Sequence, residues 1–335
     1  MNTTNNSLLP GGLQAPLAAS FTHLETNDVF QQAWSLPKWN QDYLQITKGN
    51  FQGRLSDISL GPIQLFRETM DKAVDQRGQP WPNSMAFGIP IHIEGDGYWC
   101  GDRIEPHSAF FLKPNSELKF KTPLFSDIYV AVIDHELMCN YADTIEEVDI
   151  EHLCTVSGAE RTSPQLWNAL RTSFMRAFEG ISNNPAAIND ANAVQALRED
   201  ILQTLFGGLA ALDKVKPHGT GQFVHRHIVE KAREYILSRR SNPPSVLEIC
   251  QELRISRRTL HYAFQKVLNI NPVTFLRYLR LHGARHELLT SPPGTLMISE
   301  IAAHWGFWHL GMFSSYYKDL FGETPSATAR RAISH

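Results

Sequence analysis

The order of apolar and polar residues divides the chain into a strand-rich part and a helical part. Between about Phe51 and Ile150, short apolar runs are separated by turn signals such as Gly95-Asp96-Gly97, Gly101-Asp102 and Pro114-Asn115. The apolar runs lie at Ala86–Ile93, Ser108–Leu112, Leu118–Phe120 and Asp127–Ile133. Several short strands at this spacing predict a small antiparallel barrel or sandwich over about 51–150.

A helical period follows the strand-rich part. Apolar residues recur every three or four positions at Leu166, Leu170, Phe174 and Phe178, and again at Val194, Leu197, Ile201, Leu205 and Leu209. These stripes predict helices at about 163–180 and 190–212, so flanking helices occupy about 163–212. These apolar stripes either pack on the β domain or form a dimer interface, and the sequence does not distinguish the two arrangements. The pair Gly207-Gly208 argues against a long coiled coil.

Two segments without apolar periodicity mark the domain boundaries. Residues 1–20 are rich in Asn, Ser, Thr, Gly and Pro, which predicts a mobile tail. Residues 214–222 contain a proline and two glycines and predict a linker. We therefore expect an α+β fold, with an N-terminal domain at 21–213 and an all-α domain at 223–335.

An internal repeat is the most specific feature of the predicted all-α domain. Ile249, Leu260, Phe264, Leu268 and Pro272 of the first copy correspond to Ile301, Phe313, Tyr317, Phe321 and Pro325 of the second. The last four pairs are each 53 residues apart and the first pair is 52 apart, so the second copy has one extra residue in its turn. A lone copy would be an ordinary helical hairpin, whereas two copies favour a DNA-binding function.

Each copy predicts a helix-turn-helix unit, at about 246–268 and 298–321. The helices are expected at Val246–Leu253, Arg257–Leu268, Ile298–Trp305 and Leu310–Phe321, with an amphipathic helix at Val273–Leu289 between the two units. Ser245 and Ser256 are suitable N-caps, and Gly306 supplies a left-handed turn. Asn269 and Gly322 end the two long helices. Arg277, Arg280 and Arg285 are expected on the polar side of the joining helix.

The formal net charge of −3 conceals two unlike parts. Residues 223–335 carry 15 Lys and Arg and 8 Asp and Glu, a net of +7. The rest of the chain carries 16 basic and 26 acidic residues, a net of −10. This asymmetry is typical of a nucleic-acid-binding domain attached to a domain of another function, although random drift of surface charge is the plain alternative.

Composition excludes several classes of protein. Hydrophobic residues make up 42% of the chain and charged residues 19%, which supports a folded core. No apolar run approaches the ~20 residues of a membrane span, and the first positive charge is Lys38, so a secretory signal is not expected. Cys100, Cys139, Cys154 and Cys250 form no C-x-x-C pair, which is typical of reduced thiols in a cytoplasmic protein.

The C-terminal third resembles the DNA-binding domain of the AraC/XylS transcription regulators. The matching text includes Ser256-Arg257-Arg258-Thr259-Leu260, Arg280-Leu281-x-x-Ala284 and Phe321-Gly322-x-x-Pro325-Ser326. The resemblance implies a ligand-responsive regulator, expected to be an activator, that binds double-stranded promoter DNA and contacts RNA polymerase. For the acidic half it implies a cupin-like β domain that senses an effector and forms homodimers.

Within that family, the chain is similar to the ethanolamine-operon regulators. The matching text is Trp305-Gly306-Phe307-Trp308-His309-Leu310-Gly311, Trp81-Pro82-Asn83-Ser84, Phe87-Gly88-Ile89-Pro90 and Phe66-Arg67-Glu68. This resemblance implies ethanolamine as the small-molecule effector and, by resemblance alone, cobalamin as a co-effector. No other cofactor is expected. Another amine or an aromatic acid is the alternative effector.

The second helix of each unit is expected to face the bases of DNA. In the first unit the candidates are Arg257, Arg258, His261, Tyr262 and Gln265, and in the second His309, Leu310, Ser314, Ser315 and Lys318. Arginine suits bidentate contact with guanine, worth roughly 1–3 kcal/mol of discrimination. The less polar second face favours thymine-methyl contacts, although His309 could instead belong to packing beside Trp308. The two units should enter the major groove about 10 bp apart.

The N-terminal half carries the candidate effector residues. A small ammonium ion prefers an aromatic face and a carboxylate, which selects Glu68, Trp81, Phe87 and Trp99. Taken singly, Trp81 and Phe87 fit a barrel core better than a ligand site.

An enzyme is not expected. A cupin-type metalloenzyme with an appended DNA-binding domain is the alternative class, but His92, Glu105 and His107 lack the ligand spacing, so no metal site and no catalytic residues are predicted.

Overall fold

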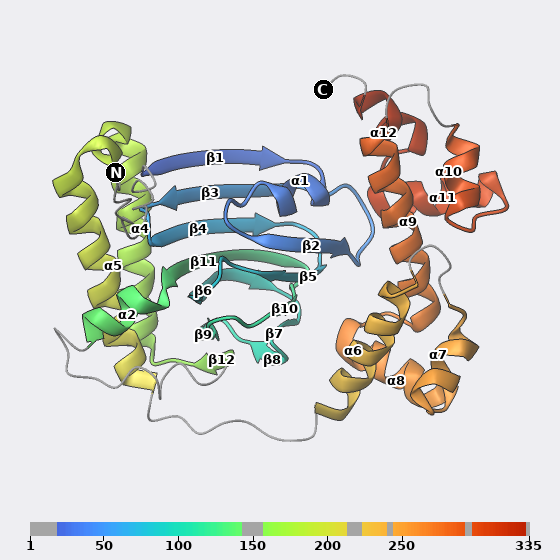
Figure 1. Ribbon diagram of the computed structural model, residues 1–335, viewed down its shortest axis with the longest axis horizontal. Coiled ribbons are helices and arrows are strands. Elements are labelled where there is room, and N and C mark those ends of the chain that lie inside the picture. The colour runs from blue at the N-terminus through green and yellow to red at the C-terminus, as the bar shows by residue number, and fades with distance from the viewer. Residues whose placement is uncertain (1–18, 143–156, 213–222, 240–243, 292–296, 333–335) are drawn as a thin grey trace, which may run out of the picture.

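Short alternating runs in the N-terminal half form two antiparallel sheets, and the C-terminal third is helical (Figure 1). The computed structural model describes residues 19–142, 157–212, 223–239, 244–291 and 297–332. This arrangement confirms the expected α+β class, with a sheet-rich N-terminal region followed by a helical domain.

The two sheets contain seven and five strands. In spatial order, the larger sheet contains β1 (Ser20–Thr26), β3 (Gly53–Ser59), β4 (Ile63–Met70), β11 (Phe125–Asp134), β6 (Ser84–Glu94), β9 (Ser108–Leu112) and β12 (Gly158–Arg161). The smaller sheet contains β2 (Asn40–Gln45), β5 (Val74–Gln79), β10 (Leu118–Lys121), β7 (Gly97–Trp99) and β8 (Asp102–Ile104). All pairings between the described strands are antiparallel, although only β3–β4 and β7–β8 join strands that are consecutive in the chain.

Alternation along each strand sends side chains to two different cores. On β4, Phe66 points into the apolar core between the sheets, whereas Leu65 points to the opposite face of the larger sheet. The core between the sheets also holds Trp99 and Phe110, whose rings lie 4.3 Å apart. Because both faces of the larger sheet are covered, its central strand β11 reads as a continuous apolar run.

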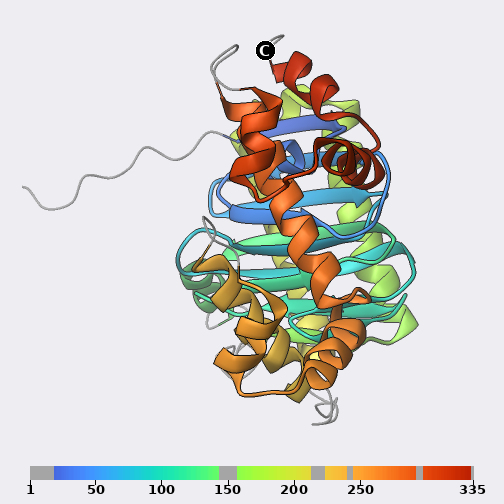
Figure 2. The same cartoon turned by 90° about the vertical axis from the view of Figure 1, so that its right-hand side faces the viewer.

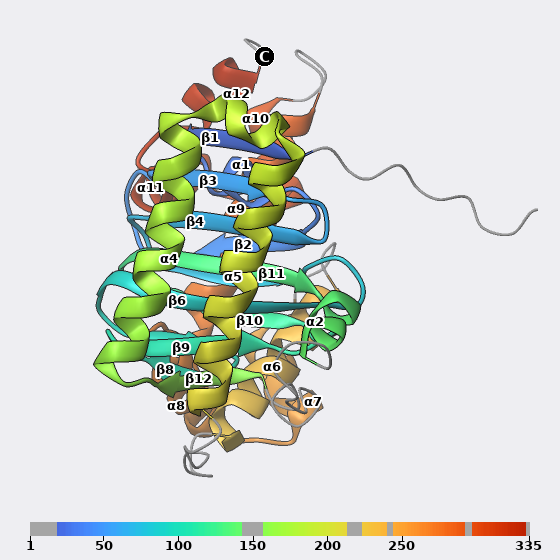
Figure 3. The ribbon, with the colours of Figure 1, turned by 90° about the vertical axis from the view of Figure 1, so that its left-hand side faces the viewer.

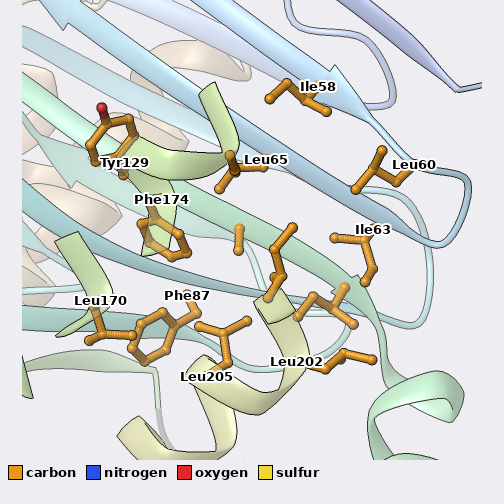
Figure 4. Packing of buried hydrophobic residues seen from close by; sticks show 14 of the residues in the cluster. Ile58, Leu60, Ile63, Leu65, Phe87, Tyr129, Leu170, Phe174, Leu202 and Leu205 are labelled. Carbon is orange, nitrogen blue, oxygen red and sulfur yellow. The ribbon is translucent and has the colours of Figure 1, made fainter. Parts of the chain in front are cut away.

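The second core lies under two long helices, α4 (Pro164–Asn183) and α5 (Ala191–Leu212), joined by a short 3₁₀ turn at Pro185–Asn189. They cross the outer face of the larger sheet (Figure 3). Phe174 of α4 and Leu205 of α5 are fully buried against Leu65 and Phe87 of the sheet (Figure 4). The apolar stripes that left two alternatives open therefore pack on the β domain.

The sequence-based boundaries need three corrections. Strands β1 and β2, with the helix α1 (Val29–Trp34) between them, precede Phe51, where we expected the strands to begin. The strand-rich region also contains the helix α2 (His135–Tyr141), because the side chain of Asp134 caps it by accepting from the amide of Glu136 at 3.0 Å. Residues 1–18 of the predicted tail and the whole predicted linker lie outside the described residues, and β1 begins inside the predicted tail.

The C-terminal helices follow the predicted repeat closely. They are α6 (Phe223–Leu237), α7 (Val246–Leu253), α8 (Arg257–Leu268), α9 (Pro272–Thr290), α10 (Ile298–His304), α11 (Leu310–Phe321) and α12 (Pro325–Ala332). Every apolar pair that defined the repeat is buried, which confirms its register. Helix α9 runs the length of the domain, with α6–α8 at one end and α10–α12 at the other (Figure 2).

The helical domain packs against the smaller sheet and its edge loops (Figure 1). Leu44 of β2 shares an apolar cluster with Ile228 of α6 and Phe264 of α8. Next to this cluster, the carboxylate of Glu230 accepts from Arg77 at 2.5 Å and from Lys119 at 2.8 Å.

A buried ion cluster ties α1 to α9. Asp28 caps α1 through one carboxylate oxygen and accepts from Arg285 at 2.5 Å and Arg331 at 3.1 Å through the other. Arg285, which we expected on the polar side of α9, is only 3% exposed, because Asp28, Glu323 and the hydroxyl of Tyr317 supply its partners. Burial tends to raise the pKa of Asp28, but the charge and hydrogen bonds of Arg285 outweigh it and lower that pKa.

We predict that Asp28→Asn destabilises the protein by about 3 kcal/mol, because it leaves the buried guanidinium of Arg285 with only Glu323 as a charged partner. Asparagine retains the N-cap, so the helix start is preserved. Urea denaturation followed by tryptophan fluorescence measures the change. Asp319→Asn, which breaks the exposed pair with Lys48, is the control and should cost under ~1 kcal/mol. Equal effects of the two substitutions would contradict the prediction.

Candidate nucleic-acid interface

Helix α8 presents the candidate reading residues of the first unit to solvent. Its buried face consists of Leu260, Ala263, Phe264 and Leu268. The candidates Arg257, Arg258, His261, Tyr262 and Gln265 are all exposed. The hydroxyl of Ser256 accepts from the amide of Thr259 at 3.0 Å, so the predicted N-cap is confirmed and fixes the start of the helix.

Two arginines stand at the positive end of this helix. Arg257 and Arg258 occupy its first turn, which holds no acidic residue. The helix dipole disfavours cations at the N-terminus of a helix, so Arg257 and Arg258 do not stabilise α8 at these positions. A phosphate or a guanine at this point would supply the missing negative partner.

The remaining first-unit candidates lie beside other parts of the protein. The ring of Tyr262 packs edge-on against His225 of α6, with the centroids 4.9 Å apart. Gln265 donates to the side chain of Asn269 at 2.9 Å and lines a cleft of about 300 Å³ together with Asp96 and Tyr98. Gln265 therefore lies at the contact between the two halves of the protein.

Helix α11 presents a less polar surface. Its buried face consists of Phe313, Tyr317, Leu320 and Phe321. Of the candidates, His309 is the N-cap, Leu310, Ser315 and Lys318 are exposed, and Ser314 is half-buried. Because His309 is exposed, packing does not account for it.

The caps predicted for the two long helices are confirmed. Asn269 and Gly322 have φ of 59° and 74°, and Gly306 has φ of 75° in the second turn. In the first turn the left-handed position is taken by Arg254 with φ of 52°, which no glycine marked in the sequence. The predicted helix end at Trp305 shifts by one residue, since α10 ends at His304.

Helix α9, which connects the two units, fixes the relative position of α8 and α11, the two helices whose exposed faces carry the DNA-binding candidates. Trp305 lies over Gly283 of α9, where a Cβ atom would stand 2.2 Å from the indole ring, and its N–H donates to Glu287 at 2.7 Å. The guanidinium of Arg277 stacks on Tyr316 of α11 at 4.2 Å. These contacts hold the second unit on α9, so its position relative to α8 is set by packing.

A buried polar cluster fills part of the interior of the N-terminal region. The carboxylate of Glu68 accepts from Gln32 and from the hydroxyl of Tyr43, both at 3.0 Å. Burial raises the pKa of Glu68 to about 7, although these two hydrogen bonds lower it. Gln76 belongs to the same cluster through Gln41, and its side-chain oxygen has no hydrogen-bond partner in the described part of the chain.

A second buried carboxylate lies on the neighbouring strand. Asp57 accepts from Gln64 at 2.7 Å, and its other oxygen has no hydrogen-bond partner among the described residues. Burial raises its pKa to about 6. The sequence did not single out Asp57, Gln76 or Tyr43. The strands β2 and β5, NQDYLQ and VDQRGQ, have no regular apolar alternation, so no local pattern marked these positions as buried.

The four predicted effector residues do not converge on one site. Phe87 packs under α4 and α5 (Figure 4). Glu68 lies two positions after Phe66 on β4, so it shares the opposite face of the larger sheet with Phe66. Trp99 is 1% exposed and donates to the carbonyl of Phe111 at 2.8 Å. Lys38 lies 4.9 Å from the ring centroid of Trp81, so a cation of the protein already occupies that aromatic face. Only Glu68 lies in the buried polar cluster.

The structure places the metal candidates with other partners. His92 contacts Glu94 at 3.2 Å, Glu105 pairs with Arg161 at 2.7 Å, and the ring of His107 packs against Trp167. Within the described ranges, no three His, Cys, Asp or Glu side chains gather as a metal site. Cys100 and Cys250 are free thiols, the sulfur of Cys139 lies 3.6 Å from a ring nitrogen of His135, and Cys154 lies outside the described residues. No described helix has the length and apolarity of a membrane span.

The helical domain is similar in sequence to part of several transcription regulators. A family profile described as "Helix-turn-helix domain" matches residues 249–331. The chain is 35% identical over 103 residues to the "Probable thc operon regulatory protein" of Rhodococcus erythropolis, covering 31% of each chain. It is 30% identical over 102 residues to the "XylDLEGF operon transcriptional activator" of Pseudomonas putida, covering 30% of this chain and 32% of that protein. The matches thus span about a third of these relatives.

A solved structure aligns over more of the chain. The crystal structure of the AraC-like transcriptional activator CuxR covers 79% of this chain and 96% of its own, with 17% identity and a TM-score of 0.41.

We predict that Glu68 makes a contribution to stability that is lost as pH rises from about 4.5 to about 7, because its pKa is higher in the folded chain than in the unfolded one. The folded protein holds the proton that the unfolded chain releases, and this contribution is roughly 3 kcal/mol. Glu68→Gln should flatten the dependence in urea denaturation at several pH values. Glu94→Gln, at an exposed position, should not change it. An unchanged slope in Glu68→Gln would refute the assignment.

Proposed function

We propose that this chain is a DNA-binding transcription regulator of the AraC/XylS type. The observation that carries the proposal is the pair of helix-turn-helix units whose repeated apolar residues are all buried while the reading faces of α8 and α11 stay exposed. Two such helices on one connecting helix suit adjacent turns of the major groove on one side of a duplex. The profile match and the two operon regulators support the same function.

The first unit would supply most of the electrostatic affinity. Helix α8 carries Arg257, Arg258 and Lys266 and no acidic residue, whereas within α11 Lys318 stands beside Asp319. Phosphate contacts position a protein on DNA, and contacts to base edges give specificity. Arg258 is the proposed base reader of the first unit, with Arg257 nearest to the phosphates.

A small cationic effector, with ethanolamine as the first candidate, is proposed to bind the buried polar cluster. Glu68 offers a carboxylate, and the unpartnered oxygens of Gln76 and Asp57 are acceptors that an ammonium or hydroxyl donor would satisfy. Such acceptors favour an amine over an aromatic acid, whose own carboxylate would be repelled here. By family resemblance, we also propose activation of transcription, homodimer formation, contact with RNA polymerase and a cytoplasmic location. Cobalamin as a co-effector rests on that resemblance alone.

Helix α1 is the proposed link between effector and DNA. Gln32 of α1 donates to Glu68, and Asp28 at the start of the same helix pairs with Arg285 of α9. The ring of Phe30 also packs edge-on against His282 of α9, 5.6 Å away. A cleft of about 930 Å³ beside α1 leaves room for a shift. An effector that moves Gln32 would therefore change the contacts that orient α9.

We predict that Arg258→Ala weakens binding to the preferred DNA and relaxes the preference at one base pair, at a cost of about 1–3 kcal/mol. The full-length protein would first select its site from random duplexes, and affinities would then be measured on single-base variants of that site. Arg239→Ala is the matched control, since it removes the same charge from an exposed position on neither reading helix. Equal losses on selected and random DNA would reject a base-reading role. Failure to select any site would reject the proposed function.

We predict that ethanolamine raises the midpoint of thermal unfolding more at pH 8 than at pH 6, because the pKa of Glu68 is about 7 and only its ionised form pairs with the ammonium group. Glu68→Gln should abolish this shift, and Glu94→Gln should retain it. Affinity for the selected DNA should change with ethanolamine in the wild-type protein and in Glu94→Gln, but not in Glu68→Gln. A shift that persists in Glu68→Gln would place the effector elsewhere.

A further inference from the structure

The turn of the second helix-turn-helix unit is one residue longer than that of the first. Backbone hydrogen bonds show which residues of the two turns correspond. In the first turn, the amide of Ile255 donates to the carbonyl of Cys250 at 3.0 Å. In the second, the amide of Phe307 donates to Ala302 at 2.8 Å. Each amide follows the left-handed residue of its turn, so Phe307 is the counterpart of Ile255.

The extra residue is Trp308. The N-cap of the reading helix is Ser256 in the first unit and His309 in the second. Ile255 is followed directly by Ser256, whereas Trp308 stands between Phe307 and His309. The insertion therefore adds a tryptophan immediately before the N-cap of α11.

The fold makes little use of the Trp308 side chain, which is 82% exposed. Its neighbours are packed, since the ring of Phe307 lies 5.1 Å from that of Phe313 and Trp305 bonds to Glu287. A tryptophan side chain carries a large apolar surface, and leaving it in water forfeits the favourable free energy of burial. Core packing thus accounts for Trp305 and Phe307 but not for Trp308.

The surface around Trp308 is apolar in a way that the first unit is not. Leu310 and Met312, in the first turn of α11, are 47% and 51% exposed. The equivalent turn of α8 contains Arg257 and Arg258. The two units therefore offer different chemistry at the same point of the same scaffold, cationic in the first and apolar in the second.

We propose that Trp308 is a specificity-determining residue of the second unit and packs on thymine methyl groups in the major groove. The proposal rests on the DNA-binding function proposed above. The N-terminal end of a reading helix contacts base edges, and the thymine methyl is the apolar group exposed in that groove. Trp308 stands directly before the N-cap of α11, at the end of the helix that would enter the groove, and its side chain is exposed there.

The test combines a protein variant with a DNA variant. Duplexes carrying the selected site would have each thymine of the second half replaced in turn by deoxyuridine, which lacks only the methyl group. For the wild-type protein, at least one replacement should weaken binding about fourfold, the equivalent of ~0.8 kcal/mol for one buried methyl. Trp308→Ala should bind the unmodified site at least about tenfold more weakly, since the whole ring is lost. It should also lose the response to that deoxyuridine.

Two further variants guard against misfolding. Deletion of Trp308 restores the shorter turn of the first unit and should reproduce the effect of Trp308→Ala. Val273→Ala changes an apolar side chain that is 53% exposed on α9, outside both units, and should leave affinity and the deoxyuridine response unchanged. Circular dichroism of each variant checks that the helices are retained.

Three results would overturn the proposal. The first is wild-type affinity in Trp308→Ala, and the second is a deoxyuridine response that persists in that variant. The third is unchanged DNA binding together with lost transcription in a reaction with purified RNA polymerase, which would make the surface a protein contact. Absence of sequence preference in the wild-type protein would instead reject the DNA-binding function itself, and this proposal with it.

Discussion

The buried guanidinium of Arg285 is the interaction on which the arrangement of the two halves depends. It stands on α9 and binds Asp28 at the start of α1, while Tyr317 of α11 and Thr328 of α12 supply further partners. A charge at this depth is tolerated only with such partners, so the elements that carry them must stay together. The N-terminal region, the connecting helix and the second unit are thereby joined at one point.

Around that point, the helical domain repeats its interior but not its surface. Leu260 and Phe264 of the first unit correspond to Phe313 and Tyr317 of the second, and all four are buried. Interior positions must fill the same space against α9, whereas exposed positions are free to differ. The polar exposed face of α8 and the more apolar exposed face of α11 are the result of that freedom, and in the proposed function they would suit two different half-sites.

The sequence predicted the helical domain better than the β region, for physical reasons. Prolines, caps and apolar periodicity all mark the same helix ends, so the predicted ends of α7, α8 and α11 match the structure. Strand β2 was missed because its inward positions Gln41 and Tyr43 belong to a polar cluster, which hides the expected alternation. Phe87 of β6 and Glu68 of β4 lie on opposite faces of one sheet, because the pairing register of both strands with β11 sets which of their residues share a face.

By itself, the sequence determined that the chain carries two helix-turn-helix units, because each depends on local signals within about 25 residues. It also determined that one turn is longer by a residue. Only the tertiary structure decided that Trp308 is the extra residue and is exposed, that Arg285 is buried, and that Glu68 belongs to a buried polar cluster. These properties depend on contacts between segments far apart in the chain, such as the 257 residues that separate Asp28 from Arg285, and no local pattern records them.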